Sequence, residues 1–198
     1  MIIPAIGLQF FPNFERSIIC YMARTIFSFI LVFYTLTGLA QDKSIPLAIQ
    51  VPAGNRLILH TYAKGVQVYV CLQYPTDTSR YTWAFAAPRA NLYADSSYHQ
   101  LIGKHYFDAG KNPTWEDTDG SKVNGVKLQQ ASQPGSNAIP WLLLKATATN
   151  GTGVLTPVTF IQRISTQGGK APATTGSAQK GQTIEVPYTA EYLFWGKE

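Results

Sequence analysis

Apolar and polar residues alternate along several short stretches of this chain, and this alternation restricts the folds that it can adopt. In the stretch 66–73, three valines and a leucine occupy every second position, with glutamine, tyrosine and cysteine between them. A period of two residues places alternate side chains on opposite faces of a β-strand, so each stretch predicts a strand with one face toward a shared apolar interior. Comparable stretches cover residues 57–63, 81–86, 101–107, 123–130, 141–149, 158–165 and 190–195.

Turn signals between these stretches favour an antiparallel arrangement. Each signal supplies a glycine, which readily adopts the positive φ of a tight hairpin turn. No window has the 3.6-residue period of a helix, so the crossover helices of a parallel α/β fold are not expected. We therefore predict an all-β fold, a single antiparallel β-sandwich or barrel-like domain, with long loops at residues 107–122 and 167–182. The turn signals are Lys64-Gly65, Asp119-Gly120, Asn124-Gly125 and Asn150-Gly151.

Residues 22–40 have the order of a secretory signal peptide. Arg24 precedes an apolar run, and small residues follow it at Gly38 and Ala40. The run is shorter than the roughly 20 residues that a membrane-spanning helix needs, so we expect a cleaved leader and no stable membrane span after cleavage. Residues 1–21 fit an upstream extension of the gene model, which leaves residues 41–198 as a single β domain. The expected location is extracytoplasmic, either secreted or periplasmic.

The charge pattern argues against a nucleic-acid partner. The formal net charge is +5, from 16 Lys and Arg residues against 11 Asp and Glu residues. The basic residues are scattered singly, whereas a nucleic-acid interface needs a clustered basic stripe with aromatic residues between. Of the two cysteines, Cys20 precedes the expected cleavage site. Cys71 therefore has no intramolecular partner in the mature chain, and its apolar stretch predicts a small buried side chain.

The sequence lacks the common motifs of cofactor and nucleophile chemistry. The stretch 151–156 has two glycines but lacks the third glycine and the helix of a dinucleotide fingerprint, and no nucleophile elbow, HExxH or Walker motif occurs. We expect no cofactor and no metal ion. One polar region nevertheless supplies imidazole and carboxylate groups, which carry protons in acid–base catalysis. It supports the alternative function, a hydrolase or lyase, metal-assisted or not, that uses His105, Glu116 and Asp119.

The leading hypothesis is a non-enzymatic, secreted or envelope-associated binding module for a glycan or another small-molecule ligand. Arg163 lies in an apolar stretch, where its charge needs a carboxylate such as Glu116, Asp119 or Glu191, or else an anionic or hydroxyl-bearing ligand. Large aromatic side chains either stack on a sugar ring or fill the core. The ligand and the oligomeric state stay open. The candidate ligand-binding residues are His105, Tyr106, Trp115, Glu116, Asp119, Arg163 and Tyr188.

Five blocks of sequence follow one another along the mature chain. They are GVQVYVC (65–71), GKHYFDAGKNPTWEDTDGSKVNG (103–125), AIPWLLLKA (138–146), FIQRISTQGGKAP (160–172) and VPYTAEYLFW (186–195). In this order they resemble a family of secreted bacterial and fungal proteins, a domain of unknown function numbered 3455. The resemblance implies export and a shared fold, with no established activity.

Two further points depend on this resemblance. Some fungal members carry the label malate dehydrogenase, which the missing nucleotide fingerprint does not support. The resemblance also implies a cysteine shortly after the GGKAP block that pairs with one like Cys71. Residues 173–180 of this chain read ATTGSAQK and contain no cysteine. The resemblance therefore gives no support here for a disulfide or for a redox role.

Overall fold

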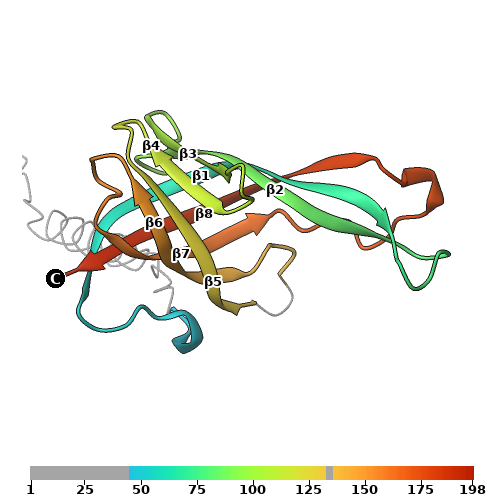
Figure 1. Cartoon of the computed structure of the whole chain (residues 1–198), viewed down its shortest axis with the longest axis horizontal. Coiled ribbons are helices and arrows are strands. Elements are labelled where there is room, and N and C mark those ends of the chain that lie inside the picture. Colours follow the sequence, from blue (N-terminus) through green and yellow to red (C-terminus); the bar gives the residue numbers. More distant parts are fainter. Residues whose placement is uncertain (1–44, 133–135) are drawn as a thin grey trace, which may run out of the picture. The chain divides into compact units, whose positions relative to one another are not determined.

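Each strand pairs with its neighbours in the sequence, and the last strand pairs with the first, which closes the sheet (Figure 1). The computed structural model describes residues 45–132 and 136–198. Within these residues the helical segments are two 3₁₀ turns, η1 (Leu47–Ile49) and η2 (Ser177–Gln179). The strands are β1 (Asn55–Gln73), β2 (Tyr81–Tyr93), β3 (Leu101–Phe107), β4 (Pro113–Asp117), β5 (Lys122–Ala131), β6 (Trp141–Asn150), β7 (Val158–Gly168) and β8 (Thr183–Lys197).

Closure of the sheet decides between the two predicted architectures. All pairings are antiparallel, so the all-β prediction is confirmed and the described strands form a barrel rather than a sandwich. A closed barrel leaves no strand edge unpaired along its circumference, which removes a site of edge-to-edge aggregation. The predicted leader, the predicted gene-model extension and Cys20 lie outside the described residues.

None of the helices in the described ranges is long and apolar enough to cross a membrane.

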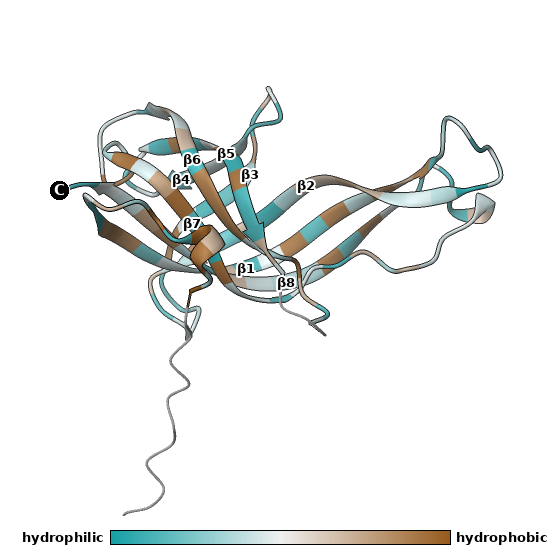
Figure 2. Ribbon diagram, turned by 90° about the horizontal axis from the view of Figure 1, so that it is seen from below, coloured by the Kyte–Doolittle hydropathy of each residue, from teal (hydrophilic) through white to brown (hydrophobic). Residues whose placement is uncertain are grey.

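Strands β1, β2 and β8 continue beyond the barrel as a three-stranded arm (Figures 1 and 2). Residues Arg89–Tyr93 of β2 pair with β3, whereas Tyr81–Pro88 pair with β1 alone. On the other side, Thr183–Pro187 of β8 pair with the outer half of β1. We call these segments, together with Val66–Gln73 of β1, the arm. The loop 169–182 connects β7 to β8 and follows the arm.

Two of the four predicted turns were wrong. The glycines at 120 and 151 have positive φ and lie in turns, as predicted, but Gly65 and Gly125 lie inside β1 and β5. At Gly65 the glycine is needed for close approach of two strands rather than for a turn. A Cβ atom there would collide with the carbonyl oxygen of Arg89 and lie 2.5 Å from the Cα of Ala90. A glycine in a strand pattern can mark such a contact, and sequence alone does not separate the two cases.

The predicted long loop at residues 107–122 is also wrong. It contains the short strand β4 between two tight turns, and β4 pairs with both β3 and β5. The strand was missed because it has five residues and three of them are polar. The other predicted loop is confirmed in large part, since residues 169–182 contain one isolated bridge and one 3₁₀ turn but no strand.

Alternate side chains of the strands meet in the barrel interior, as the period of two predicted. Figure 2 shows apolar and polar residues alternating along the strands. On the outer half of β1, however, the buried residues are Gln67, Tyr69 and Cys71, whereas the valines between them are half-exposed. The main core comprises Ala63, Ala90, Leu92, Trp115, Val123, Ile139, Leu144, Leu155, Val158, Ile161, Tyr188, Ala190, Tyr192 and Phe194.

A second, smaller cluster covers the outer surface of β6, β7 and β8. Ile49 of η1 is fully buried there, so the segment before β1 shields this part of the barrel. The backbone carbonyl of Ile49 accepts a hydrogen bond from the Gln162 side chain at 2.7 Å, and the indole of Trp195 donates to the same glutamine at 2.9 Å. The other members of the cluster are Trp141, Leu143, Ile164 and Leu193.

Cys71 is a free, fully buried thiol on the arm, as its apolar stretch predicted. Its Sγ lies 3.2 Å from the Oγ1 of Thr175 in the loop 169–182. Backbone hydrogen bonds tie the same loop to β1, because Gly181 donates to the Cys71 carbonyl and Cys71 donates to the Gln182 carbonyl, both at 2.9 Å. The loop is therefore attached to the arm close to the thiol.

Candidate functional site

Four of the seven predicted ligand-binding side chains lie inside the barrel: His105, Trp115, Arg163 and Tyr188. His105 of β3 is opposite Trp115 of β4, and their rings stack with centroids 4.3 Å apart. Tyr192 of β8 contacts both rings, at 5.2 and 5.5 Å between centroids, and is the register partner of Arg163 on β7. Trp115 is 1% exposed and Tyr188 is 3% exposed. Neither ring is therefore available to stack on a sugar at the surface.

His105 is held as a neutral imidazole. It is buried, and burial lowers its pKa to about 3 because the charged form would lose its hydration. The charge of Arg163 also lowers this pKa, while the hydrogen bond to Thr114 opposes both effects. The Nδ1 of His105 lies 2.9 Å from the carbonyl oxygen of Thr114, which can only accept, so Nδ1 carries the proton. Nε2 is then the atom with the free lone pair.

The lowered pKa of His105 predicts a loss of stability in mild acid. The unfolded chain binds a proton on this residue below pH 6.5, but the folded chain binds one only near pH 3. The folded protein is therefore most stable, with respect to His105, above pH 6.5. As the pH falls below this value, the free energy of unfolding decreases by up to about 1.4 kcal/mol per pH unit. Urea unfolding of wild type and of His105→Phe between pH 6.5 and about pH 5, above the range of most carboxyl groups, checks this. We expect a smaller slope in the variant, and parallel slopes would contradict the assignment.

Arg163 does not have the carboxylate partner that was considered for it. Its Nε and Nη2 donate hydrogen bonds to the backbone carbonyl of Pro140, at 3.2 and 2.9 Å. Among the described residues no carboxylate lies within ion-pair distance of the guanidinium. Glu116 and Asp119 are on other parts of the barrel, and Glu191 pairs with His60 at 3.0 Å. The predicted ion pair with any of these three acids is therefore wrong.

Tyr106 and Glu116 lie on the outer wall of the barrel, on neighbouring strands. The Tyr106 hydroxyl donates a 2.6 Å hydrogen bond to Glu116, and the ammonium groups of Lys104 and Lys122 each lie 3.4 Å from the same carboxylate. The hydrogen bond to the carboxylate, with partial burial, raises the pKa of Tyr106 to about 12. The Tyr106 hydrogen bond and the two lysines lower the pKa of Glu116. This pair is thus held as a phenol and a carboxylate.

Asp119 lies in the turn between β4 and β5, and its side chain links this turn to the one between β6 and β7. Its carboxylate accepts hydrogen bonds from the backbone and hydroxyl of Ser121, at 2.7 and 2.6 Å, and from the backbone of Val154 at 2.7 Å. The Ser121 hydroxyl is the main cause of its lowered pKa. His105 points into the barrel and Glu116 lies on its outer wall, so the structure does not bring the three candidate catalytic residues together. Residues 45–132 and 136–198 also contain no group of three or more potential metal ligands.

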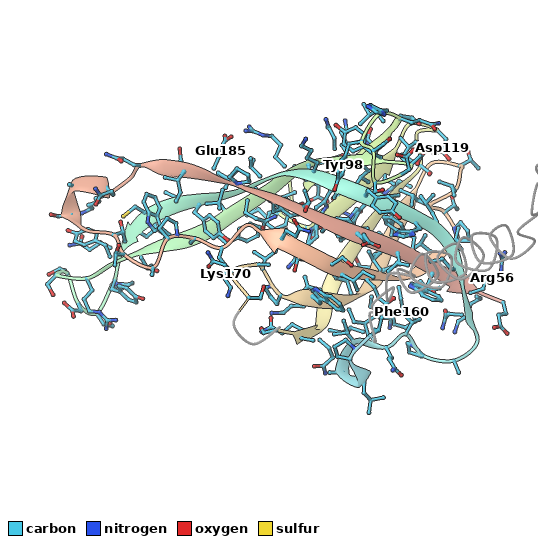
Figure 3. All side chains as sticks on the ribbon, turned by 180° about the vertical axis from the view of Figure 1, so that it is seen from behind. Arg56, Tyr98, Asp119, Phe160, Lys170 and Glu185 are labelled. Atoms are coloured by element: carbon cyan, nitrogen blue, oxygen red, sulfur yellow. The ribbon has the colours of Figure 1, made fainter. Side chains whose placement is uncertain are left out.

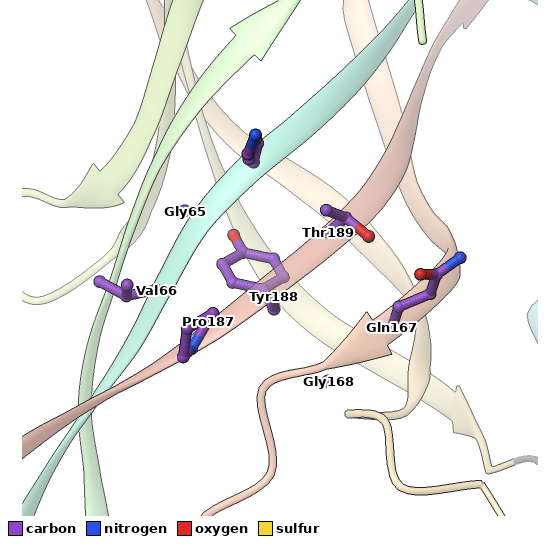
Figure 4. A pocket seen from close by; sticks show the side chains of 8 residues that line it. Gly65, Val66, Gln167, Gly168, Pro187, Tyr188 and Thr189 are labelled. Carbon is purple, nitrogen blue, oxygen red and sulfur yellow. The ribbon is translucent and has the colours of Figure 1, made fainter. Parts of the chain in front are cut away.

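Three hollows adjoin one another on the outer wall of the barrel. The largest, of about 450 Å³, lies over β8 between β1 and β7, and Figure 4 shows the Tyr188 ring at its centre with Val66, Pro187, Thr189 and Gln167 around it. A second, of about 280 Å³, shares Lys64, Gly65 and Val66 with the first and reaches Arg89 and Asn91 on β2. A third, of about 270 Å³, shares Asn91 and continues to Gly103, Lys104 and Glu116. We call this continuous surface the wall groove.

Strand register explains the row of polar side chains in the wall groove. Lys64 of β1 is opposite Asn91 of β2, which is opposite Lys104 of β3, and Lys104 is in turn opposite Glu116 of β4. These four polar side chains therefore form one row across four strands. The glycines at 65, 103 and 168 let paired strands approach closely beside this row, because a Cβ atom at each would lie within 2.6 Å of a backbone oxygen of the neighbouring strand.

Tyrosines lie along one margin of the wall groove. The Lys64 ammonium lies 5.4 Å from the ring centroid of Tyr98, and Tyr98 contacts Tyr93 edge-to-face at 5.5 Å. Tyr62, the register partner of Tyr93, is half-buried on the same face as Lys64. Figure 3 shows Tyr98 on the barrel and Glu185 on the arm. The margin thus combines exposed parts of aromatic rings with polar side chains of both signs.

The sequence analysis singled out Glu116 and Tyr106 but missed Lys64, Asn91 and Lys104. Their position in one row depends on strand register, and bulges shift that register within β1–β2 and β2–β3. The one usable signal was the glycine at 65, which was interpreted as a turn.

An eight-stranded antiparallel barrel with a polar cluster in its core and a hollowed outer wall defines the structural class of this protein. The chain belongs to the family described as "Protein of unknown function (DUF3455)", whose profile matches residues 52–196. The family predicted from the five sequence blocks is thereby confirmed. No curated protein and no solved structure shows a significant match to the chain.

Proposed function

We propose that this protein is a non-enzymatic binding module exported from the cytoplasm, and that its wall groove binds an oligosaccharide. The observation that carries the proposal is the continuity of the three hollows: the first and second share Lys64 and Gly65, and the second and third share Asn91. Together they provide an elongated, open surface rather than one deep pocket. An elongated surface fits a chain of sugar units better than it fits a single compact molecule.

The chemistry of the wall groove supports a sugar as the ligand. Each sugar hydroxyl both donates and accepts hydrogen bonds, and the row offers ammonium donors from Lys64 and Lys104, an amide from Asn91 and the carboxylate of Glu116. The tyrosines at the margin present rings with an apolar face and a polar tip, which suits the mixed surface of a sugar. Aromatic and polar groups are therefore available side by side.

The charges of the wall groove favour a neutral glycan over a polyanion. Lys104 and Lys122 both approach Glu116, and Arg89 pairs with Glu185 at 2.6 Å. Cations that are already paired with acids give little of the counterion release that drives nucleic-acid binding. Lys64 has no carboxylate within 4.0 Å in the described part of the chain, and it is the cation most available to a ligand hydroxyl.

A glycan array probed with the purified protein, followed by calorimetry on the best ligand, tests this proposal. Lys64→Ala removes a charged donor, and Asn91→Ala removes an amide; both positions are exposed, so the fold should be retained. We expect each variant to weaken binding about tenfold, because a hydrogen bond to a charged or amide group contributes about 1–2 kcal/mol. Lys145→Ala, an exposed lysine on β6, is the matched control and should bind as wild type does. Absence of binding on the array, or wild-type affinity in both wall-groove variants, would refute the proposal.

A further inference from the structure

The barrel interior contains a buried cation without a described counter-charge. Arg163 is 9% exposed, and its described hydrogen bonds go to one backbone carbonyl, that of Pro140. A guanidinium group does not lose its proton at any ordinary pH, so it cannot escape the cost of burial by becoming neutral. A buried charge that lacks a partner is strongly destabilising. Some group of opposite charge is therefore expected beside it.

Several buried hydrogen-bond donors near Arg163 have no well-formed hydrogen bond. Within the described residues, the amide nitrogen of Gln67, the hydroxyls of Tyr188 and Tyr192 and the indole nitrogen of Trp115 are buried and unbonded. Each of these groups carries a hydrogen that it can donate. Buried polar groups almost always have a partner, and a lone unpaired one is costly. Four such donors in one barrel call for an acceptor.

These groups face one another rather than being scattered. Tyr192 is the register partner of Arg163 and contacts the rings of His105 and Trp115. The Tyr188 hydroxyl lies within hydrogen-bonding reach of Tyr192 and Gln67, and these contacts affect its pKa, as does the charge of Arg163. The same charge also acts on the buried His105. Strands β1, β7 and β8 thus direct a guanidinium, an amide and two phenols toward one region of the interior.

We propose that the barrel interior binds one compact anion, held by the Arg163 guanidinium together with the hydroxyls of Tyr188 and Tyr192 and the amide of Gln67. An anion accepts hydrogen bonds from all of these donors and also neutralises the charge. Water would satisfy the donors but would leave the charge uncompensated. The described hollows open on the outer wall, Tyr188 lines the largest of them, and an eight-stranded barrel has room for side chains or for one small ligand. The occupant is therefore a halide or a small carboxylate such as formate, and not a sugar.

Anomalous diffraction from wild-type crystals grown in sodium bromide tests the site directly. The expected result is a bromide peak in contact with the Arg163 guanidinium and the two tyrosine hydroxyls. Bromide peaks confined to the protein surface, with water or nothing beside Arg163, would overturn the proposal. This outcome does not depend on whether the wall groove binds a glycan, because the peak is sought beside Arg163, which lines none of the three hollows.

Thermal unfolding at constant ionic strength provides the second measurement and distinguishes the two kinds of anion. Replacing gluconate, which is too large for the interior, by chloride or by formate should raise the Tm of wild type by about 5 to 10 °C at a hundredfold excess over the Kd. The anion that acts at the lower concentration is the preferred ligand. The shift should vanish in Arg163→Met and shrink in Tyr188→Phe. Because Tyr188→Phe keeps the ring and loses only the hydroxyl, it still tests the site if Arg163→Met fails to fold. The control Arg56→Met removes an exposed arginine outside the wall groove and should keep the full shift. Equal shifts in all four proteins would contradict an interior site.

Discussion

Replacing Thr175 by cysteine is expected to create a disulfide with Cys71 and to raise the free energy of unfolding by about 3 kcal/mol. The Oγ1 of Thr175 already lies 3.2 Å from the Cys71 Sγ, so a sulfur at that position needs only a small shift to reach bonding distance. The two residues are 104 apart in the sequence, and closing so long a loop removes much of the entropy of the unfolded chain. The Tm should rise by about 6 to 12 °C.

Thr175→Ser is the matched control for the disulfide, since it keeps the hydroxyl and forms no bond. Denaturant unfolding with and without reductant separates the cross-link from the substitution. We expect the gain to disappear on reduction and to be absent from the control. A Thr175→Cys protein whose thiols at positions 71 and 175 both stay titratable after oxidation would show that the loop 169–182 is not held against the arm as described. The same stretch of chain is where the family resemblance implied a cysteine.

Replacing Gly65 by alanine is expected to destabilise the barrel by about 3 kcal/mol or more, among the largest effects of a single added methyl group. A Cβ atom at this position meets backbone atoms of Arg89 and Ala90 on the paired strand, and backbone cannot move aside as the end of a side chain can. The strands β1 and β2 would have to separate where the arm leaves the barrel. Denaturant unfolding followed by circular dichroism measures the loss.

Gly176→Ala provides the control for this prediction. The nearest atom to a Cβ there is the end of the Gln179 side chain at 3.7 Å, an ordinary contact, and the backbone φ of −153° suits any residue. We expect a change within about 0.5 kcal/mol. Similar stabilities of the two variants would mean that β1 and β2 do not approach as closely at Gly65 as the structure has them.

The strands that follow a clean alternation were predictable from the sequence. The stretch 101–107 matches β3 at both ends, and the stretches 141–149 and 158–165 match β6 and β7 to within a few residues. These stretches are long and rich in β-branched and aromatic residues, which identifies them as strands although a second apolar cluster also covers the outer faces of β6 and β7. β1 was predicted as two strands because Gly65 interrupts the pattern, and β4 was missed because polar residues occupy most of its five positions.

The candidate site was predictable in its residue types but not in its arrangement. Apolar context indicated that Arg163 would be buried, and it is, but no sequence feature indicated that Pro140 would accept its hydrogen bonds. His105 and Trp115 lie ten residues apart, and only the tight turn between β3 and β4 stacks them. The row through Lys64 and Asn91 depends on the register between β1 and β2. Contacts of that kind are set by register, which a local pattern does not record.

Mapping a bound oligosaccharide by NMR tests the central claim, that the wall groove is the binding surface. The purified protein, labelled with ¹⁵N, would be titrated with the best ligand from the glycan array. The account predicts backbone shift changes concentrated at residues 64–66 on β1, 89–91 on β2 and 103–104 on β3, with β5 and the outer face of β6 unchanged. Changes centred on β5 and β6, or no change at saturating ligand, would contradict it.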